Sequence, residues 1–198
     1  MTLGPDTPAD PATTGYFINH FSLNVRNLTA SIDFYYQVLG VRHIFTLQAS
    51  EHLAIAYMGH AQGGKNGTGY QTAAELARDK NNLAGLIEMI QLDVPNWDLP
   101  ASTAKANTFG HVGVVVPDVE AVQARLDTMD NVEVLKGLSD PMPFTGPIAN
   151  SNGFPEEVWE HIDDEERALI EAVIGGVNQN FIIVADPDGN MVEIQAQG

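Results

Sequence analysis

Four side chains in this sequence could bind a metal ion together: His20, Glu88, His111 and Glu193. Each belongs to an otherwise apolar segment, where a carboxylate is costly to bury unless it is paired or binds a cation. Two neutral imidazoles and two carboxylates balance the charge of a divalent ion. This nitrogen and oxygen set suits Ni²⁺, Co²⁺, Zn²⁺, Mn²⁺ or Fe²⁺ and lacks the soft ligands that select copper(I). Six-coordination would leave two positions for water or substrate, as a catalytic metal requires.

The alternation of side chains along a strand predicts where these four residues point. In residues 17–25, Phe21 and Leu23 share one face and His20 lies on the other. His111 and Glu193 likewise face away from their apolar neighbours. If the sheets curve, all four side chains are expected to point into one shared concavity.

An internal repeat supports the metal site. Residues 20–30 can be aligned with residues 111–121, and both segments begin with a histidine and end with an alanine. Each half reads as a strand, a helix and three further strands, with a histidine in the first strand and a glutamate in the last. A single strand histidine or glutamate is usually structural. The same two residue types in equivalent places of two halves make a metal site the better interpretation.

The repeat also predicts the organisation of the chain. Residues 1–15 are rich in Pro, Gly, Thr and Asp and are expected to form a disordered tail. A first βαβββ module is expected over residues 16–100 and a second over residues 107–198. The second contains an insertion at about residues 137–178, for which we expect a cover over a pocket; a plain surface insertion is the alternative.

Local signals predict the helices and their ends. The periodic segment 30–39 should be a helix capped by Thr29 and ended by Gly40. Further helices are expected over 73–80, 119–129 and 163–173, the last ended by Gly175 and Gly176. Strands are expected over these segments: 41–47, 52–58, 86–92, 132–136, 180–184 and 191–195.

Composition excludes several classes of function. The 198 residues include 26 acidic and 9 basic side chains and no cysteine, for a net charge of −17. Such an acidic surface repels nucleic-acid backbones and anionic membranes. Without cysteine there is no disulfide, thiolate ligand or cysteine nucleophile. No apolar run approaches the ~20 residues of a membrane span and the start lacks signal-peptide features, so we expect a cytoplasmic protein that acts on a small molecule.

The sequence resembles the vicinal oxygen chelate superfamily (glyoxalase, bleomycin resistance protein and dioxygenase), and within it glyoxalase I, the lactoylglutathione lyases. The resemblance is carried by Asn19-His20 and by segments 31–40, 109–118 and 186–193. It implies an α+β fold in which two βαβββ modules form curved mixed sheets around a metal-binding cup. By position, His20, Glu88, His111 and Glu193 match the four metal ligands of the bacterial-type enzymes, and the cup is often completed across a homodimer.

The resemblance implies a lyase or isomerase reaction by proton transfer through a metal-bound enediolate, on a hemithioacetal or another α-hydroxycarbonyl. Glu193 would abstract a carbon-bound proton and Glu88 would return it. Two alternatives stay open: an Fe(II)-dependent dioxygenase of the same superfamily, and a non-catalytic small-molecule-binding member. Glu88 counts against the dioxygenase because a fourth protein ligand would occupy a position that oxygen needs.

The sequence also departs from glyoxalase I. Asn24 and Asn107 stand where that family has arginines that hold the carboxylates of glutathione. Replacing a guanidinium by an amide removes the main attraction for a carboxylate. We therefore expect a neutral or weakly charged substrate, unless Arg26, Arg42 or Lys105 replaces the missing cations.

Overall fold

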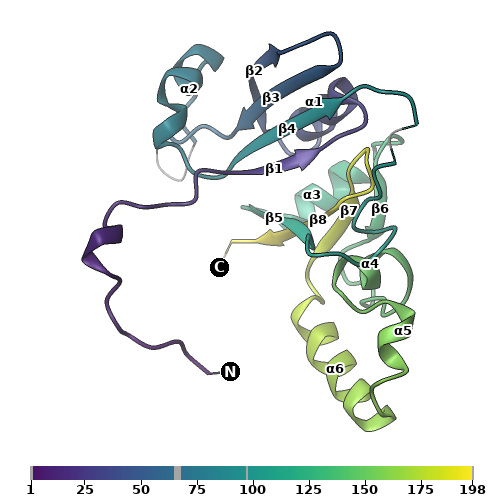
Figure 1. The fold of residues 1–198 in the computed structure, drawn as a ribbon. Coiled ribbons are helices and arrows are strands. Elements are labelled where there is room, and N and C mark those ends of the chain that lie inside the picture. Colours follow the sequence, from purple (N-terminus) through teal and green to yellow (C-terminus); the bar gives the residue numbers. More distant parts are fainter. Residues whose placement is uncertain (1, 65–67, 97, 198) are drawn as a thin grey trace.

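The chain folds into two four-stranded mixed sheets with helices, an α+β architecture that confirms the predicted fold class (Figure 1). This computed structural model describes residues 2–64, 68–96 and 98–197. Parts of the expected tail and of both expected modules, namely residues 1, 65–67, 97 and 198, lie outside the described residues.

The two halves share the order strand, helix and three strands, but their additional helices lie between the third and fourth strands of the first half and between the second and third strands of the second. The first contains β1 (His20–Asn24), α1 (Leu28–Gln37), β2 (Arg42–Gln48), β3 (Leu53–Gly59), α2 (Ala73–Asp79), the short 3₁₀ helix η3 (Lys80–Asn82) and β4 (Leu86–Leu92). The second contains β5 (His111–Val116), α3 (Val119–Leu126), β6 (Glu133–Lys136), α4 (Gly146–Ser151), α5 (Glu156–Trp159), α6 (Asp164–Val177), β7 (Ile182–Ala185) and β8 (Met191–Ala196). The sheet orders are β1-β4-β3-β2 and β5-β8-β7-β6, so each first strand lies at an edge beside the last strand of its half.

The register is equivalent in the two sheets. Parallel pairing sets Ser22 opposite Glu88 in the first sheet and Gly113 opposite Glu193 in the second. In both sheets the glutamate is therefore opposite the residue two positions after the histidine. Because alternate residues share a face, this register places each histidine and glutamate on the same face of its own sheet.

The helix after each first strand is capped by an equivalent residue. Asn27 accepts a hydrogen bond from the backbone N–H of Ala30, and Asp118 accepts one from Ala121. Both caps lie seven residues after the histidine. The prediction of Thr29 as the first cap was wrong, because α1 begins one residue before it. Gly40 does adopt the left-handed backbone, with φ of 70°, that lets the chain leave this helix.

Both sheets contribute one face to a shared core. Its buried residues include Leu23, Ile87 and Met89 from the first sheet and Val112 and Val192 from the second, and α1 and α3 pack in the same cluster. The faces that carry the histidines and glutamates are the opposite ones. In a single chain, the sheet faces opposite the candidate ligands are therefore buried together in one core. The two faces that carry the candidate ligands point away from that core.

The insertion packs on the ligand face of the second sheet. Met142 and Ile148 pack against Ile183 and Met191, which are register neighbours of Glu193 and His111 on that face. The insertion forms α4, α5 and α6, and α6 continues through Gly175 and Gly176, which were wrongly expected to end it. The helix ends at Asn178, whose backbone and side-chain amides both donate to the carbonyl of Ile174.

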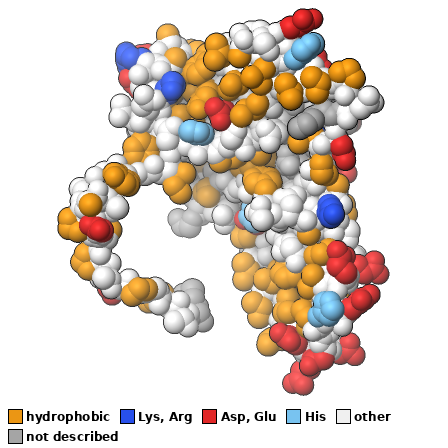
Figure 2. Space-filling model, viewed as in Figure 1, with side chains coloured by type: hydrophobic (Ala, Val, Ile, Leu, Met, Phe, Trp, Pro, Cys, Tyr) orange, Lys and Arg blue, Asp and Glu red, His pale blue; other side chains and the backbone are white. Residues whose placement is uncertain are grey.

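Two parts of the molecule lie away from the sheets: the N-terminal segment and the tip of the insertion. The N-terminal segment runs away from both sheets (Figure 1), and residues 2–18 are exposed. Acidic side chains gather at the tip of the insertion (Figure 2), where the first turn of α6 carries Asp164, Glu165 and Glu166. In the part of the chain that the structure describes, every helix is too short or too polar to cross a bilayer.

Candidate metal centre in two halves

His20 and Glu88 form the first half-site. The Nε2 atom of His20 lies 4.0 Å from Oε2 of Glu88, and the two side chains are 38% and 20% exposed. They reach each other from the neighbouring strands β1 and β4, as the register requires. Both side chains are close enough to share a small ligand and open enough to be reached from outside.

His111 and Glu193 form the second half-site with nearly the same geometry. The Nε2 atom of His111 lies 3.8 Å from Oε2 of Glu193, and the Glu193 side chain is only 13% exposed. The insertion covers the sheet beside this pair, which explains why its carboxylate is the more buried of the two. The second half-site is thus a more enclosed copy of the first.

The structure does not bring the four residues together within one chain. Among the described residues, no group of three or more His, Cys, Asp or Glu side chains is arranged to hold a metal ion. Each pair nevertheless fits part of a metal site. Two donors that each lie ~2.1 Å from an ion can be at most about 4.2 Å apart, and both pairs fall within this limit. Each half-site therefore offers one nitrogen and one oxygen donor.

Tyr57 belongs to the first half-site, although its sequence pattern did not indicate it. It lies opposite Glu88 in the register of β3 and β4, and its ring makes an edge contact with His20 at 5.5 Å between centroids. Burial, reinforced by the neighbouring Glu88 carboxylate, raises the pKa of the Tyr57 phenol. The phenol thus stays protonated beside Glu88 at neutral pH. Only the cross-strand register could have identified it.

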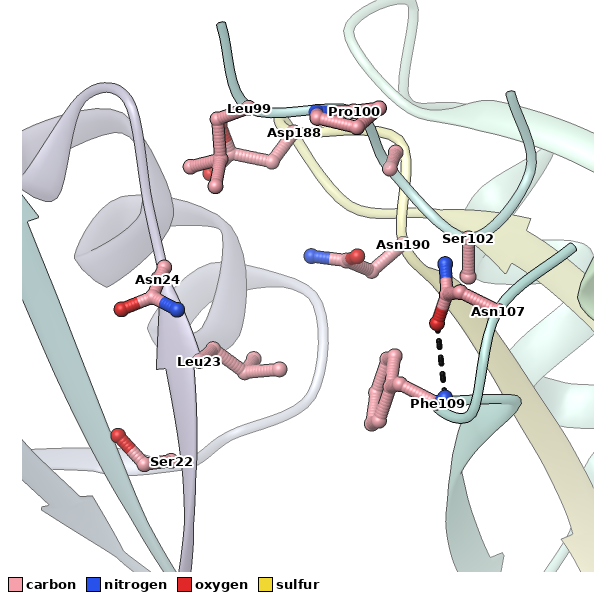
Figure 3. A pocket seen from close by; sticks show the side chains of 11 residues that line it. Ser22, Leu23, Asn24, Leu99, Pro100, Ser102, Asn107, Phe109, Asp188 and Asn190 are labelled. Atoms are coloured by element: carbon pink, nitrogen blue, oxygen red, sulfur yellow. Dashed lines mark hydrogen bonds between the residues drawn. The ribbon is translucent and has the colours of Figure 1, made fainter. Parts of the chain in front are cut away.

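A cavity of about 330 Å³ lies between the end of β1, the segment at residues 99–109 and the turn before β8 (Figure 3). Asn24, Asn107 and Asn190 line it, and the amide of Asn190 points across it toward Asn24. None of the described residues that line this cavity is Lys or Arg. Both positions where arginines were missing in the sequence therefore open into the same cavity, and both present amides.

The three cations considered as replacements do not line this cavity. Arg26 is paired with an acidic residue of the cavity wall: its Nε donates to Asp188 Oδ1 at 3.0 Å and its Nη2 donates to the Asp188 carbonyl at 2.7 Å. Arg42 lies over the ring of Tyr70, 4.7 Å from its centroid. The backbone carbonyl of Lys105 accepts from Asn107 at 3.1 Å, but Lys105 does not line the cavity. Among the described residues, the cavity wall thus has no cation that would attract a carboxylate.

Comparison with known proteins identifies the family. The Glyoxalase/Bleomycin resistance protein/Dioxygenase superfamily matches residues 17–194, which cover both sheets. The chain belongs to this superfamily. A lactoylglutathione lyase of Pseudomonas putida is 28% identical over 167 residues, covering 78% of this chain and 91% of that protein.

Two solved structures share the superfamily fold. A glyoxalase family protein from Bacillus cereus is 13% identical with a TM-score of 0.52, and the match covers 95% of this chain and 98% of that one. The trypanothione-dependent glyoxalase I of Leishmania major is 15% identical with a TM-score of 0.50, covering 92% and 87%. At these identities the likeness establishes the fold, while the chemistry must be argued from the half-sites.

Proposed function

We propose that this superfamily member is a divalent-metal-dependent lyase or isomerase of the glyoxalase I type. The observation that carries the proposal is the repeated half-site, in which equivalent strands and equivalent register set a histidine Nε2 about 4 Å from a glutamate Oε2 twice. A pair of partly buried carboxylates, each beside an imidazole, is the donor set of an ion such as Ni²⁺, Co²⁺, Zn²⁺, Mn²⁺ or Fe²⁺.

The complete site forms between two copies of the chain. The sheet faces opposite the candidate ligands share one core. The two faces that carry the ligands therefore cannot approach each other within one chain. In a two-fold homodimer the first half-site of one chain meets the second half-site of its partner, and symmetry generates two equal sites. His20 and Glu88 come from one chain and His111 and Glu193 from the other.

A bound divalent ion would supply Lewis-acid polarisation of neighbouring substrate oxygens. The protein supplies the proton transfer. Glu193, the less exposed carboxylate, takes the proton from the substrate carbon, and Glu88 on the opposite wall returns a proton to the neighbouring atom. The insertion beside Glu193 limits the access of water to this step.

The substrate is proposed to be neutral or weakly charged near the amide-lined cavity. Asn24, Asn107 and Asn190 offer amide donors and acceptors for hydroxyl, carbonyl or amide groups, whereas a glutathione carboxylate would find no cation among the described lining residues. An α-hydroxycarbonyl or a hemithioacetal of an uncharged thiol fits this wall better than a glutathione adduct.

The Glu193→Gln variant tests the proposed function. We expect it to keep its melting temperature but to lose at least ~10²-fold in turnover of methylglyoxal hemithioacetals, prepared from glutathione and from 2-mercaptoethanol, because the amide cannot accept the proton. Glu120→Gln, an exposed change in α3, is the matched control. Turnover that depends on oxygen and Fe²⁺ would identify a dioxygenase instead. A purified protein without stoichiometric metal would indicate a binding protein.

A further inference from the structure

Asn19, the residue before His20, makes four hydrogen-bonding contacts beside the first half-site. Its Nδ2 donates to the carbonyls of Lys80 at 2.8 Å and Leu83 at 2.6 Å, and its Oδ1 lies 2.9 Å from Nδ1 of His20. Its backbone carbonyl accepts from the N–H of Leu86 at 3.0 Å. Asn19 thus ties the start of β1 to the segment that leads into β4, the strand of Glu88.

These contacts fix the orientation of the amide. Backbone carbonyls only accept hydrogen bonds, so the amide nitrogen must face Lys80 and Leu83 and the amide oxygen must face His20. That oxygen only accepts as well, so Nδ1 of His20 must carry the donated hydrogen. In the neutral ring the lone pair then lies on Nε2, the atom that faces Glu88.

The first half-site is therefore arranged for a cation before one binds. An imidazole lone pair and a carboxylate oxygen face each other over 4.0 Å with no hydrogen between them. Two electron-pair donors in this arrangement repel each other, and a positive ion between them removes the repulsion. Binding through Nε2 then needs no change of tautomer.

The second half-site has no residue equivalent to Asn19. Gly110 precedes His111 and has no side chain, and a Cβ atom added there would lie 3.3 Å from the carbonyl of Ser151 in α4. In the described parts of the chain, the one polar contact of the His111 ring is with Glu193. The insertion that covers the second half-site thus occupies the space that an equivalent of Asn19 would need.

We propose that Asn19 is a positioning residue that holds His20 in the Nδ1–H form, so that its Nε2 lone pair is free to bind a metal ion. The first half-site then captures the ion, and the second half-site completes its coordination shell. The hydrogen bonds of Asn19 alone determine the tautomer of His20. The role of Asn19 in capturing the ion rests on the proposed function. Partners of this kind change metal affinity about 10- to 100-fold in other proteins.

The tautomer can be measured without metal or substrate. Two-bond ¹H–¹⁵N correlation spectra of the metal-free protein, recorded at alkaline pH so that the imidazoles are neutral, distinguish Nδ1–H from Nε2–H rings. We expect His20 to be in the Nδ1–H form alone and His111 to show the Nε2–H form as well. A wild-type His20 in the Nε2–H form would overturn the proposal without any variant.

Two variants separate the roles of Asn19. Asn19→Leu, which has nearly the same shape, removes the acceptor and should let the Nε2–H form of His20 appear. Titration calorimetry with Co²⁺ should then show at least a tenfold loss of affinity. Asn19→Asp keeps the acceptor, so it should retain the Nδ1–H form and most of the affinity. Asn131→Leu, the same change at an exposed site, is the control for surface hydrophobicity.

The outcomes distinguish this proposal from the proposed function. An unchanged His20 tautomer in a folded Asn19→Leu protein would contradict the role of Asn19. A changed tautomer with unchanged Co²⁺ affinity would contradict its contribution to metal capture. A wild-type protein whose His20 is in the Nδ1–H form but that binds no Co²⁺ would overturn the proposed metal chemistry. It would still support the role of Asn19 in setting the tautomer of His20.

Discussion

Under the proposed function, two asparagines determine the charge of the substrate that this chain accepts. Asn24 and Asn107 come from different parts of the sequence yet line one cavity, at the positions where the resemblance led us to expect arginines. An amide offers hydrogen bonds without charge, so it binds a carboxylate far more weakly than a guanidinium does. The proposed preference for an uncharged substrate thus depends on two single positions.

Restoring both arginines tests this view. The double variant Asn24→Arg, Asn107→Arg should lower KM for the glutathione hemithioacetal of methylglyoxal at least tenfold, because a hydrogen bond to a charged group contributes about 1.5–3 kcal/mol. The gain should shrink at high salt, which screens exposed charges. Arginines at the exposed positions Asn81 and Asn131 control for net charge. An unchanged KM would show that this cavity does not contact the thiol part of the substrate.

The candidate ligands predicted from the sequence have a signal in the sequence itself, whereas the structure adds a neighbouring residue that has none. His20, Glu88, His111 and Glu193 stood out because the repeat duplicates them. Tyr57 shares the first half-site only through the register of β3 and β4, and no residue near it in the chain indicates that register. Site residues that depend on cross-strand neighbours are invisible to alternation and spacing alone.

Among the elements, the insertion is held at its base by one buried lysine. Lys136 is 2% exposed, and its ammonium donates to the carbonyls of Gly137, Gln179 and Phe181, at the two ends of the insertion. Three carbonyls thus converge on one ammonium. This arrangement fixes where the insertion leaves and rejoins the second sheet.

Lys136→Met should therefore loosen the insertion. The thioether fills the same space but donates no hydrogen bond, so the three carbonyls lose their charged partner at a cost of about 1–3 kcal/mol. Urea unfolding should show this loss, and hydrogen exchange should become faster in α4 and α6 than in β1. Lys105→Met at an exposed site is the control. Equal hydrogen-exchange rates of α4 and α6 in the wild type and the variant would contradict the role of Lys136 in holding the insertion.

Sequence patterns predicted the strands and the helices of the repeat well and the insertion poorly. Alternation and periodicity reproduce β4 and the start of α2, because the pattern of burial and the caps are written locally. The short helices α4 and α5 have few local signals and form where Ile148 and Trp159 are buried by tertiary packing. Gly175 and Gly176 reduce helix propensity, but the capping by Asn178 decides where α6 ends.

At the scale of the whole molecule, a buried polar network joins the two halves. Tyr35 of α1 donates to Asp186 in the turn before β8, and Ser31 and Arg26 donate to Asp188 in the same turn. Burial raises the pKa of Asp186, although the hydrogen bonds from Asn190 and Tyr35 act in the opposite direction. The network ties the strand that carries Glu193 to the first half of the chain.

Tyr35→Phe should lower the free energy of unfolding by about 1–3 kcal/mol at neutral pH, because the Asp186 carboxylate loses a donor. That loss raises the pKa of Asp186 further in the folded variant. The variant then binds more protons than the wild type as the pH falls, so the difference in stability should shrink between pH 7 and pH 4. Tyr36→Phe, at an exposed neighbouring tyrosine, is the control. A difference that grows on acidification would contradict the network.

The sequence did not show whether the two half-sites of one chain face each other. Alternation predicts that His20 and His111 face away from the helices, and the structure agrees. It does not predict that the helix-facing sides of both sheets share one core, which turns the two half-sites apart. That outcome depends on how the modules pack, through contacts between residues far apart in the chain.

Complementation between two inactive chains tests the joining of half-sites most directly. One chain carries His20→Ala and Glu88→Gln, the other carries His111→Ala and Glu193→Gln, and the two are co-expressed with different tags. In a heterodimer of the proposed kind, one site combines both mutated half-sites and the other combines both intact ones. Random pairing then restores about a quarter of the tightly bound Co²⁺ of the wild type. If co-expression restores no more Co²⁺ than either variant binds alone, the site does not form across two chains.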